Sequence, residues 1–487
     1  MSVGNTDERA SSLLTTPVPP GRVLVGTAAM ALVLGLSRWG TNIGFSPLFI
    51  TDILIALSLV NWLLTAKLSG RRPLSGWVPR SAPTVLFQLF FFYMLARFLF
   101  AVGNGPILLW LRDGMPFLYG IMAFISARSL ATSAGSTRAL TMKVFWWAMG
   151  VHLVWTSLVH VTGTQSGFAL PGGVFSAPVF QMRPDIDSAL IALTVGMCLR
   201  QVMLGRHRTW AVLAILVGVA TVFTLGTRAG LISVIIALAV SYGLTYSAIH
   251  KLSGRRVAMV LMVPAVVVLL AIVLPMTTPG KRLLATVGEV TSSSAASAAD
   301  VGAQENAQGT QRAREMVWSA TVDWTNETTA RHLFGSGFGN DFLEQAGVKS
   351  FLEGTTYTNV RSPHNWFVGI YARMGLIGLS LAAVFIIQLM YLILRHRQRI
   401  GEDPLFSLSA LTVVAILPVA TLGVVLEAPF GAVPFFWASG MLMTLAPARQ
   451  GRGADRITDT DTDTATDLGP APATRADLPP DERTAHP

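Results

Sequence analysis

Long apolar runs dominate the pattern of hydrophobic and polar positions along the chain. Twelve of these runs lie between residues 22 and 446. A transmembrane helix needs about 17 to 25 apolar residues, and each run is close to that length or longer. The pattern therefore predicts an all-α polytopic membrane protein with about twelve transmembrane helices, at residues 22–39, 45–65, 84–103, 107–127, 140–161, 186–204, 209–226, 229–248, 257–276, 365–395, 406–425 and 429–446.

Polar stretches divide the chain into five predicted regions. Residues 1–20 and 447–487 are rich in Thr, Asp, Pro and Ala, which is typical of disordered tails. Residues 21–276 hold the first nine predicted helices, and residues 365–446 hold the last three. Between them, residues 277–364 form one large loop, which includes the Ser-, Ala- and Gly-rich, flexible segment 286–310.

Basic residues predict the orientation of these helices, because Lys and Arg of short loops gather on the cytoplasmic side. The start of the chain lacks the pattern of a cleaved signal peptide, so the first helix is predicted to be retained. The opposite turns hold only scattered arginines. Both termini are therefore predicted in the cytoplasm and the large loop outside, since the even-numbered helix ends carry Lys67, Arg71, Arg72, Arg80, Arg128, Arg138, Lys143, Arg200, Arg206, Arg208, Lys251, Arg255, Arg256, Arg395, Arg397 and Arg399.

Composition supports a membrane protein and narrows its chemistry. Hydrophobic residues make up 52% of the chain and charged residues only 13%, against about 25% charged in soluble proteins. The net charge of +10 follows from the topological bias, so it does not indicate nucleic-acid binding. The one cysteine, Cys198, lies in an apolar run, which excludes a disulfide framework or a thiolate metal site. No spacing of His or carboxylate residues resembles a metal site, so neither a metal nor a cofactor is expected.

The sequence of the large loop predicts two local structures. Ala313, Met316, Val317, Ala320 and Trp324 recur at steps of three and four residues, which predicts an amphipathic helix over 311–330. The glycine-rich stretch 333–340 resembles a nucleotide-binding fingerprint, which would have to follow a strand and open a helix. Because this stretch follows a helix, it is predicted to be a tight turn that returns the chain to the membrane.

The candidate site is the hexapeptide 361–366, Arg-Ser-Pro-His-Asn-Trp. Ser362 suits the N-cap of a helix and Pro363 its first position, which would place His364 and Asn365 in the first turn. Unpaired backbone N–H groups and the positive end of the helix dipole favour phosphate there. The same field keeps histidine neutral, as a general base must be. The alternative is an ordinary surface histidine at a helix start.

The length of this helix bears on its exposure. A helix from Pro363 to Leu394 would measure about 48 Å, against about 30 Å for the hydrocarbon core. Its first turns are therefore predicted to stand above the bilayer, with His364 and Arg373 at or above the outer interface.

Arginines on the predicted outer side offer partners for a phosphate, because the guanidinium fork matches phosphate oxygens. Arg228 lies in a tight turn between two apolar runs, and Arg314 lies on the predicted loop helix. Other charged residues fall at outer helix ends and allow two interpretations, substrate contact or structural ion pairing such as Asp52 with Arg97 or Arg112: Asp52, Arg97, Arg112, Asp113 and Arg183.

Three motifs resemble the O-antigen ligase and polysaccharide polymerase superfamily over roughly residues 210–445: the turn 227–230 (Thr-Arg-Ala-Gly), the loop with 314–318 and 333–340, and the helix start 364–366 continuing to the Gly-Leu-Ile-Gly of 375–378. That superfamily consists of multi-pass bacterial glycosyltransferases that use undecaprenyl-diphosphate-linked glycans. The resemblance implies a metal-independent, inverting reaction.

The resemblance also implies roles for individual residues. His364 would be the base, and Arg228 and Arg314 would bind the diphosphate. Asn365 and Arg373 are expected to contact substrate, as are the outer arginines Arg183 and Arg112. Relatives often carry a second histidine near the first, whereas this chain has Ser362 two residues before His364. This departure weakens a two-histidine scheme, and with it the ligase subtype.

The expected function is transfer or polymerisation of a glycan onto an acceptor sugar hydroxyl, outside the plasma (inner) membrane of a bacterium. The partners would be the lipid-linked donor, membrane lipids and a glycan, lipid or wall-polymer acceptor, with no nucleic acid. A flippase or another transporter without catalytic activity is the main alternative, but it needs no large external loop. A scaffold that displays the loop to a partner is a third interpretation.

Overall fold

The structure is a computed structural model that describes residues 20–45, 48–68, 81–131, 133, 135–164, 178–248, 314–349 and 361–446. All of them belong to one compact unit, residues 1–447. Several sequence predictions lie wholly or almost wholly outside the described residues: both tails, the span 257–276 and the segment 286–310.

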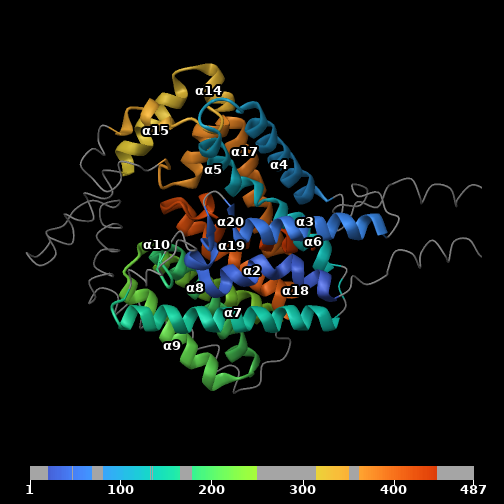
Figure 1. Cartoon of the computed structure of the whole chain (residues 1–487). Helices are drawn as coiled ribbons and strands as arrows, with labels where there is room; N and C mark the ends of the chain where they lie inside the picture. Colours follow the sequence, from blue (N-terminus) through green and yellow to red (C-terminus); the bar gives the residue numbers. More distant parts are fainter. Residues whose placement is uncertain are drawn as a thin grey trace, which may run out of the picture. The chain divides into compact units, whose positions relative to one another are not determined.

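The described residues are almost entirely helical (Figure 1). One antiparallel pair of two-residue strands, β1 (Gly44–Phe45) and β2 (Leu48–Phe49), is the exception among them. Residues 314–326 are helical, as the periodicity of the loop predicts. The other helices are α2 (Pro20–Thr41), α3 (Ile50–Leu68), α4 (Ala82–Phe100), α5 (Ile107–Leu118), α6 (Ile121–Ala131), α7 (Gly135–Val161), α8 (Pro184–Leu204), α9 (Arg208–Leu225), α10 (Arg228–Ala248), α14 (Thr329–Phe334), α15 (Phe342–Gln345), α17 (Trp366–Arg395), α18 (Arg397–Glu402), α19 (Pro404–Leu422), the 3-10 helix η2 (Val425–Glu427) and α20 (Pro429–Met443).

Nine helical segments of the described chain are long and apolar enough to cross a membrane. Two shorter apolar helices, Ile50–Leu64 and Pro429–Met443, correspond to predicted runs 45–65 and 429–446. The polytopic membrane fold is thus confirmed, whereas the number of twelve spans and the orientation of the termini stay predictions.

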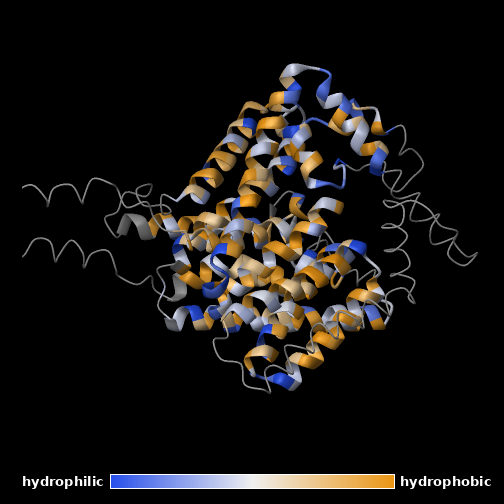
Figure 2. Cartoon of the chain, turned by 180° about the vertical axis from the view of Figure 1, so that it is seen from behind, coloured by the Kyte–Doolittle hydropathy of each residue, from blue (hydrophilic) through white to orange (hydrophobic). Residues whose placement is uncertain are grey.

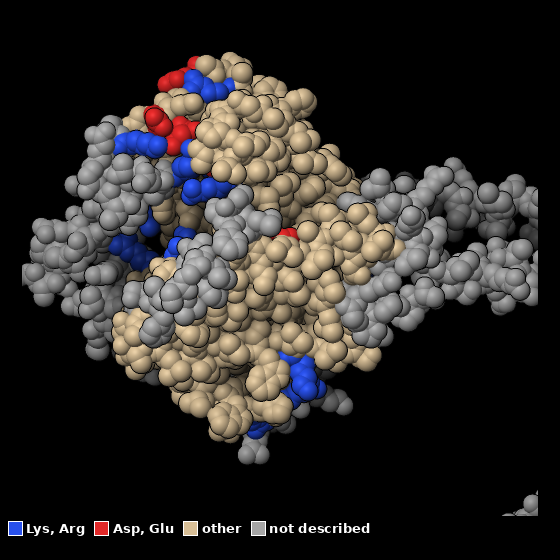
Figure 3. Space-filling view, viewed as in Figure 1, with Lys and Arg blue, Asp and Glu red and all other residues tan. Residues whose placement is uncertain are grey.

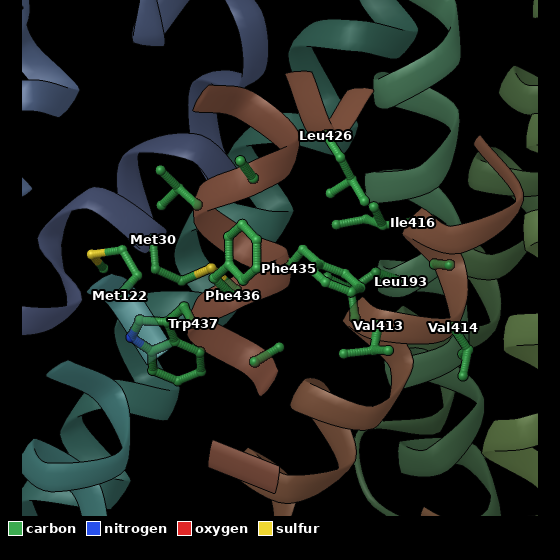
Figure 4. Close-up of a cluster of buried hydrophobic side chains, with 14 of the residues drawn as sticks. Met30, Met122, Leu193, Val413, Val414, Ile416, Leu426, Phe435, Phe436 and Trp437 are labelled. Carbon is green, nitrogen blue, oxygen red and sulfur yellow. The ribbon is translucent and has the colours of Figure 1, made fainter. Parts of the chain in front are cut away.

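The centre of the bundle is formed by helices that are apolar on all sides. The apolar part of α8 is 94% buried, and α8 packs against α9, α10 and α19. A helix that is hydrophobic all round is suited to such an interior position. Phe435, Phe436 and Trp437 of α20 are at most 1% exposed and pack among side chains of α2, α6, α8 and α19 (Figure 4). Hydrophobic residues predominate along most of the helices (Figure 2).

Helix α17 differs from its prediction as one straight helix, because it kinks at Gly375, whose φ is 67°. The glycine-rich turn after α14 fills the kink. Ser336 N and Gly337 N donate to the carbonyls of Ala372 and Arg373, at 2.8 and 2.9 Å. Tyr93 of α4 donates to the Met374 carbonyl at 2.9 Å. The kink therefore anchors the returning loop at the level of Arg373.

Candidate functional site

The start of α17 differs from the predicted cap. Asn365, not Ser362, is the N-cap, and its Oδ1 accepts from the backbone N–H groups of Phe367 and Val368 at 3.0 and 3.3 Å. Asn is as good a capping residue as Ser. The φ of His364 is 55°, which is not a right-handed helical value, so the helix begins only after this residue. The prediction that His364 and Asn365 lie in the first turn, beside unpaired N–H groups, is therefore wrong.

His364 nevertheless lines a cavity of about 670 Å³. The cavity is lined by helix ends that the sequence assigns to the outer side of the membrane, namely the end of α2 and the starts of α3, α8 and α20. Helix α5 and the segment before α17 complete its lining among the described residues. Basic side chains gather around a hollow on the face viewed in Figure 3. Among the described residues, the charged side chains lining the cavity are Arg38, Arg112, Asp113, Arg183, Arg361, Arg373 and Glu427, in addition to His364.

Two of the five arginines form ion pairs with the two carboxylates that line the cavity. Arg361 contacts Asp113 at 2.9 Å and Asp341 at 3.2 Å. Arg373 contacts Glu427 at 3.3 Å and also donates to the Arg361 carbonyl at 3.2 Å. Buried pairs of this kind hold their geometry, because separating them leaves an uncompensated charge.

The other three arginines pair with no carboxylate among the described lining residues. Within the described residues, the side chains of Arg38 and Arg112 form no hydrogen bond or ion pair. Arg183 Nε donates to Asp185 at 2.9 Å, and its guanidinium lies 4.9 Å from the centre of the Phe430 ring. Four carboxylates contact three of the five arginines, so the excess positive charge among the described lining residues is that of Arg38 and Arg112, which favours an anion.

His364 is held by the residue two positions before it. Its backbone N–H donates to Ser362 Oγ at 3.4 Å, and its Nδ1 lies 3.3 Å from the Ser362 carbonyl oxygen. A carbonyl only accepts hydrogen bonds, so Nδ1 carries the proton of the neutral ring. Nε2 therefore keeps the lone pair.

Burial lowers the pKa of His364, and the charge of Arg314 lowers it further. A neutral imidazole was predicted, but the cause is different, because burial and a nearby arginine replace the dipole of a first helical turn. For Glu427, burial raises the pKa, whereas Arg373 and the hydrogen bond from Ser362 act in the opposite direction.

The structure places the other predicted site residues as follows. Arg112, Arg183 and Arg373 line the cavity together with His364, while Asn365 caps α17. Arg314 is close enough to influence the pKa of His364. Neither Arg314 nor Arg228, the first residue of α10, is among the described residues of the lining.

The suggested ion pairs of Asp52 are wrong. Asp52 accepts from the Tyr119 hydroxyl at 2.7 Å and from Phe49 N at 2.9 Å. Arg97 donates to the Gly335 carbonyl. Asp113 is instead the partner of Arg361.

Sequence reasoning missed Arg38 and Glu427, and it included Arg361 in the candidate hexapeptide without giving it a role. A signal for Glu427 existed, because it is the one charged residue between Asp403 and Arg449, and an isolated charge in an apolar stretch usually has a partner or a task. No group of three or more His, Cys, Asp or Glu side chains that would suit a metal ion occurs in the described part of the chain.

The fold and the cavity define a multi-pass membrane protein with a basic cavity at one end of its helices. Residues 211–383 match the family model described as O-antigen ligase, which confirms the resemblance to the O-antigen ligase and polymerase-like superfamily. The matched segment includes α10, the loop helices, His364 and the kink of α17. A search of curated proteins found no match to the chain.

Proposed function

We propose that the protein is a membrane glycosyltransferase that transfers or polymerises a glycan from an undecaprenyl-diphosphate-linked donor onto an acceptor sugar hydroxyl, outside the inner membrane of a bacterium. The family match supports an O-antigen ligase-like membrane enzyme. The observation that carries the finer proposal is the cavity in which His364 lies among five arginines.

The proposed reaction is a direct displacement at the anomeric carbon of the donor. Nε2 of His364 removes the proton of the acceptor hydroxyl as its oxygen forms the new bond to that carbon. The bond to the diphosphate breaks, and the lipid diphosphate leaves with the electron pair. A single displacement inverts the anomeric centre, and no step requires a metal ion.

The basic lining would stabilise the leaving diphosphate. Arg38 and Arg112 pair with no carboxylate among the described residues, whereas Arg183 donates through Nε to both oxygens of Asp185. Charge that grows in the transition state is best stabilised by donors already fixed in place. The start of α20 also lines the cavity and has no side-chain cap. At the start of α8, the carboxylates of Asp185 and Asp187 already accept from the N–H groups of Ile186 and Arg183. Arg228 and Arg314 remain proposed diphosphate ligands from the family motif alone.

The proposal is tested with the purified protein in liposomes, using a lipid extract that contains the host's own polyprenyl-diphosphate-linked glycan. Release of polyprenyl diphosphate in the presence of a membrane extract as acceptor source measures transfer. Arg183→Lys is expected to raise the donor KM or lower kcat at least 10-fold, because a point charge does not replace a fork. Arg228→Lys, measured in parallel, shows whether Arg228 of the family motif affects turnover as much as Arg183 does.

The transporter alternative predicts a different result. A flippase would move the labelled donor between leaflets without releasing polyprenyl diphosphate. Movement without release would contradict the glycosyltransferase, whereas release that depends on Arg183 would support it.

A further inference from the structure

A connected set of polar contacts leads from Arg373 to His364. Arg373 Nη1 lies 3.3 Å from Glu427 Oε2, and the Ser362 hydroxyl lies 2.8 Å from Glu427 Oε1. Ser362 in turn contacts His364 at two points, with its hydroxyl and with its carbonyl. These contacts join α17, η2 and the segment that precedes α17.

Burial holds the first pair in this set, Arg373 and Glu427, in place. The side chains of Arg373 and Glu427 are only 4% and 9% exposed. A carboxylate removed from water remains with its cation and its hydrogen-bond donors, because water does not replace them. Glu427 is therefore a stationary acceptor for the Ser362 hydroxyl.

The single proton of that hydroxyl determines the rest. Arg373 pairs with Glu427 and favours its ionised form, and a carboxylate only accepts, so the proton of Ser362 Oγ is directed to Glu427. A lone pair of Oγ then remains for the backbone N–H of His364. The Ser362 carbonyl accepts from Nδ1, which leaves the lone pair of the ring on Nε2.

The backbone of His364 shows that this orientation needs support. A φ of 55° is uncommon for residues other than glycine, and it persists where the surroundings over-determine it. Ser362 bonds both to the backbone N–H and to the ring of His364, so it restrains the rotation of both.

We propose that Glu427 and Ser362 are positioning residues, which hold His364 in the orientation and tautomer that let Nε2 accept the proton of the acceptor hydroxyl. This inference rests on the proposed role of His364 as the general base. A merely structural Glu427, or a Glu427 that is itself the base, would act independently of His364.

The test measures release of polyprenyl diphosphate by full-length protein in nanodiscs, with the same donor and acceptor extracts. The variants are Glu427→Gln, Ser362→Ala and Ser362→Thr, each alone and combined with His364→Ala. Asp403→Asn is the matched control, because it also removes a carboxylate that pairs with an arginine, Arg138. Asp403 caps the start of α19, at the end of that helix away from the cavity, and Asn can still serve as the cap. This control is expected to retain wild-type turnover.

The positioning role predicts a particular kinetic pattern. Glu427→Gln and Ser362→Ala should lower kcat about 10- to 100-fold while KM changes less than about twofold, because a misplaced base impairs the chemical step. Ser362→Thr, which keeps the hydroxyl, should recover most of the rate. In the His364→Ala background, either substitution should lower the remaining rate less than about twofold.

Nitrogen-15 NMR of the ring of His364 gives a readout that needs no turnover. The wild-type ring should be in the Nδ1-protonated neutral tautomer, and Ser362→Ala should give a mixture. An unchanged tautomer in both Ser362→Ala and Glu427→Gln would contradict the inference. If Glu427→Gln does not fold, Ser362→Ala carries the test, since it removes one hydroxyl only.

Three kinetic outcomes would overturn the inference, and they are distinguishable. Full loss by Glu427→Gln on top of His364→Ala would show that Glu427 acts independently. Wild-type turnover of Glu427→Gln and Ser362→Ala, with His364→Ala inactive, would overturn the positioning role and leave the proposed function intact. Wild-type turnover of His364→Ala would remove the base assignment and the inference together.

Discussion

His364 is held in a left-handed backbone conformation and lies against a basic cavity wall. Burial lowers its pKa, and Arg314 adds to this effect. A base must be unprotonated to accept a proton, so the low pKa extends the active form toward acidic pH. The surroundings of His364 therefore suit the role proposed for it.

This environment predicts the pH dependence of the reaction. The rate should fall as the pH decreases through the pKa of His364, with a midpoint below the ordinary value of 6.5. Arg314→Gln removes a positive charge that disfavours the imidazolium ion, so the midpoint should move to higher pH. The pH profile of kcat measures it. Arg314→Lys keeps the charge and should leave the midpoint in place; an equal shift in both variants would contradict the electrostatic cause.

At single residues, the sequence selected several side chains that the structure brings to one cavity, but it did not predict their geometry. It identified His364 as the candidate base, but it assigned the cap to Ser362, because both Ser362 and Asn365 are good capping residues and only the backbone path decides between them. Arg373 was expected to contact substrate, but its side chain pairs with Glu427 of η2, which connects α19 and α20. Contacts between residues so distant in sequence leave no local pattern.

At the scale of elements, the kink in α17 connects the loop to the membrane helices. Gly375 has φ 67° and ψ −169°, a conformation that is essentially restricted to glycine. Gly335 of the returning turn approaches the same point, with φ 72°. Glycines at these positions let two backbones come close enough for the loop to donate hydrogen bonds to α17.

Gly375→Ala is expected to destabilise the protein by more than the about 1–3 kcal/mol of one strained residue. The added Cβ would lie 2.3 Å from the backbone carbon and oxygen of Leu333, which is too close for any contact. Thermal unfolding in detergent measures the effect. Gly150→Ala in α7 is the control, because its Cβ would meet nothing within 4 Å, and a gain of up to about 1 kcal/mol is expected. Equal stability of both variants would contradict the proposed role of the kink.

Apolar length and periodicity sufficed to predict most of the helices. The loop helix over 314–326 was readable from the three- and four-residue steps that include Val317, Ala320 and Trp324, and Trp324 is buried. The kink was not predicted, since a glycine inside an apolar run is equally compatible with a straight helix. What decides it is the turn 335–337, which supplies hydrogen-bond donors from outside the helix.

At the scale of the whole molecule, the helix ends that the sequence assigns to the outer side contribute to one cavity. Arg38 lies in the last turn of α2, Arg183 precedes α8 and Glu427 precedes α20. In the proposed function, this cavity is where a water-borne acceptor and a lipid-linked donor would meet.

The sidedness can be tested with cysteine labelling in intact cells. Cys198 is the only cysteine in the chain, so Cys198→Ala supplies a background without thiols. Thr162→Cys lies just after α7 on the cavity side, and Arg206→Cys lies between α8 and α9 at the opposite ends; both positions are exposed. A membrane-impermeant maleimide should label the first in intact cells and the second only after permeabilisation. The reverse pattern would place the cavity in the cytoplasm.

The central claim is that His364 is the base of a glycosyl transfer from a lipid diphosphate. The most direct measurement is release of polyprenyl diphosphate by folded His364→Ala in liposomes, compared with wild type. A loss of about 10²- to 10⁴-fold in kcat is expected, which is the usual contribution of a general base. Turnover equal to that of the wild type would contradict the claim.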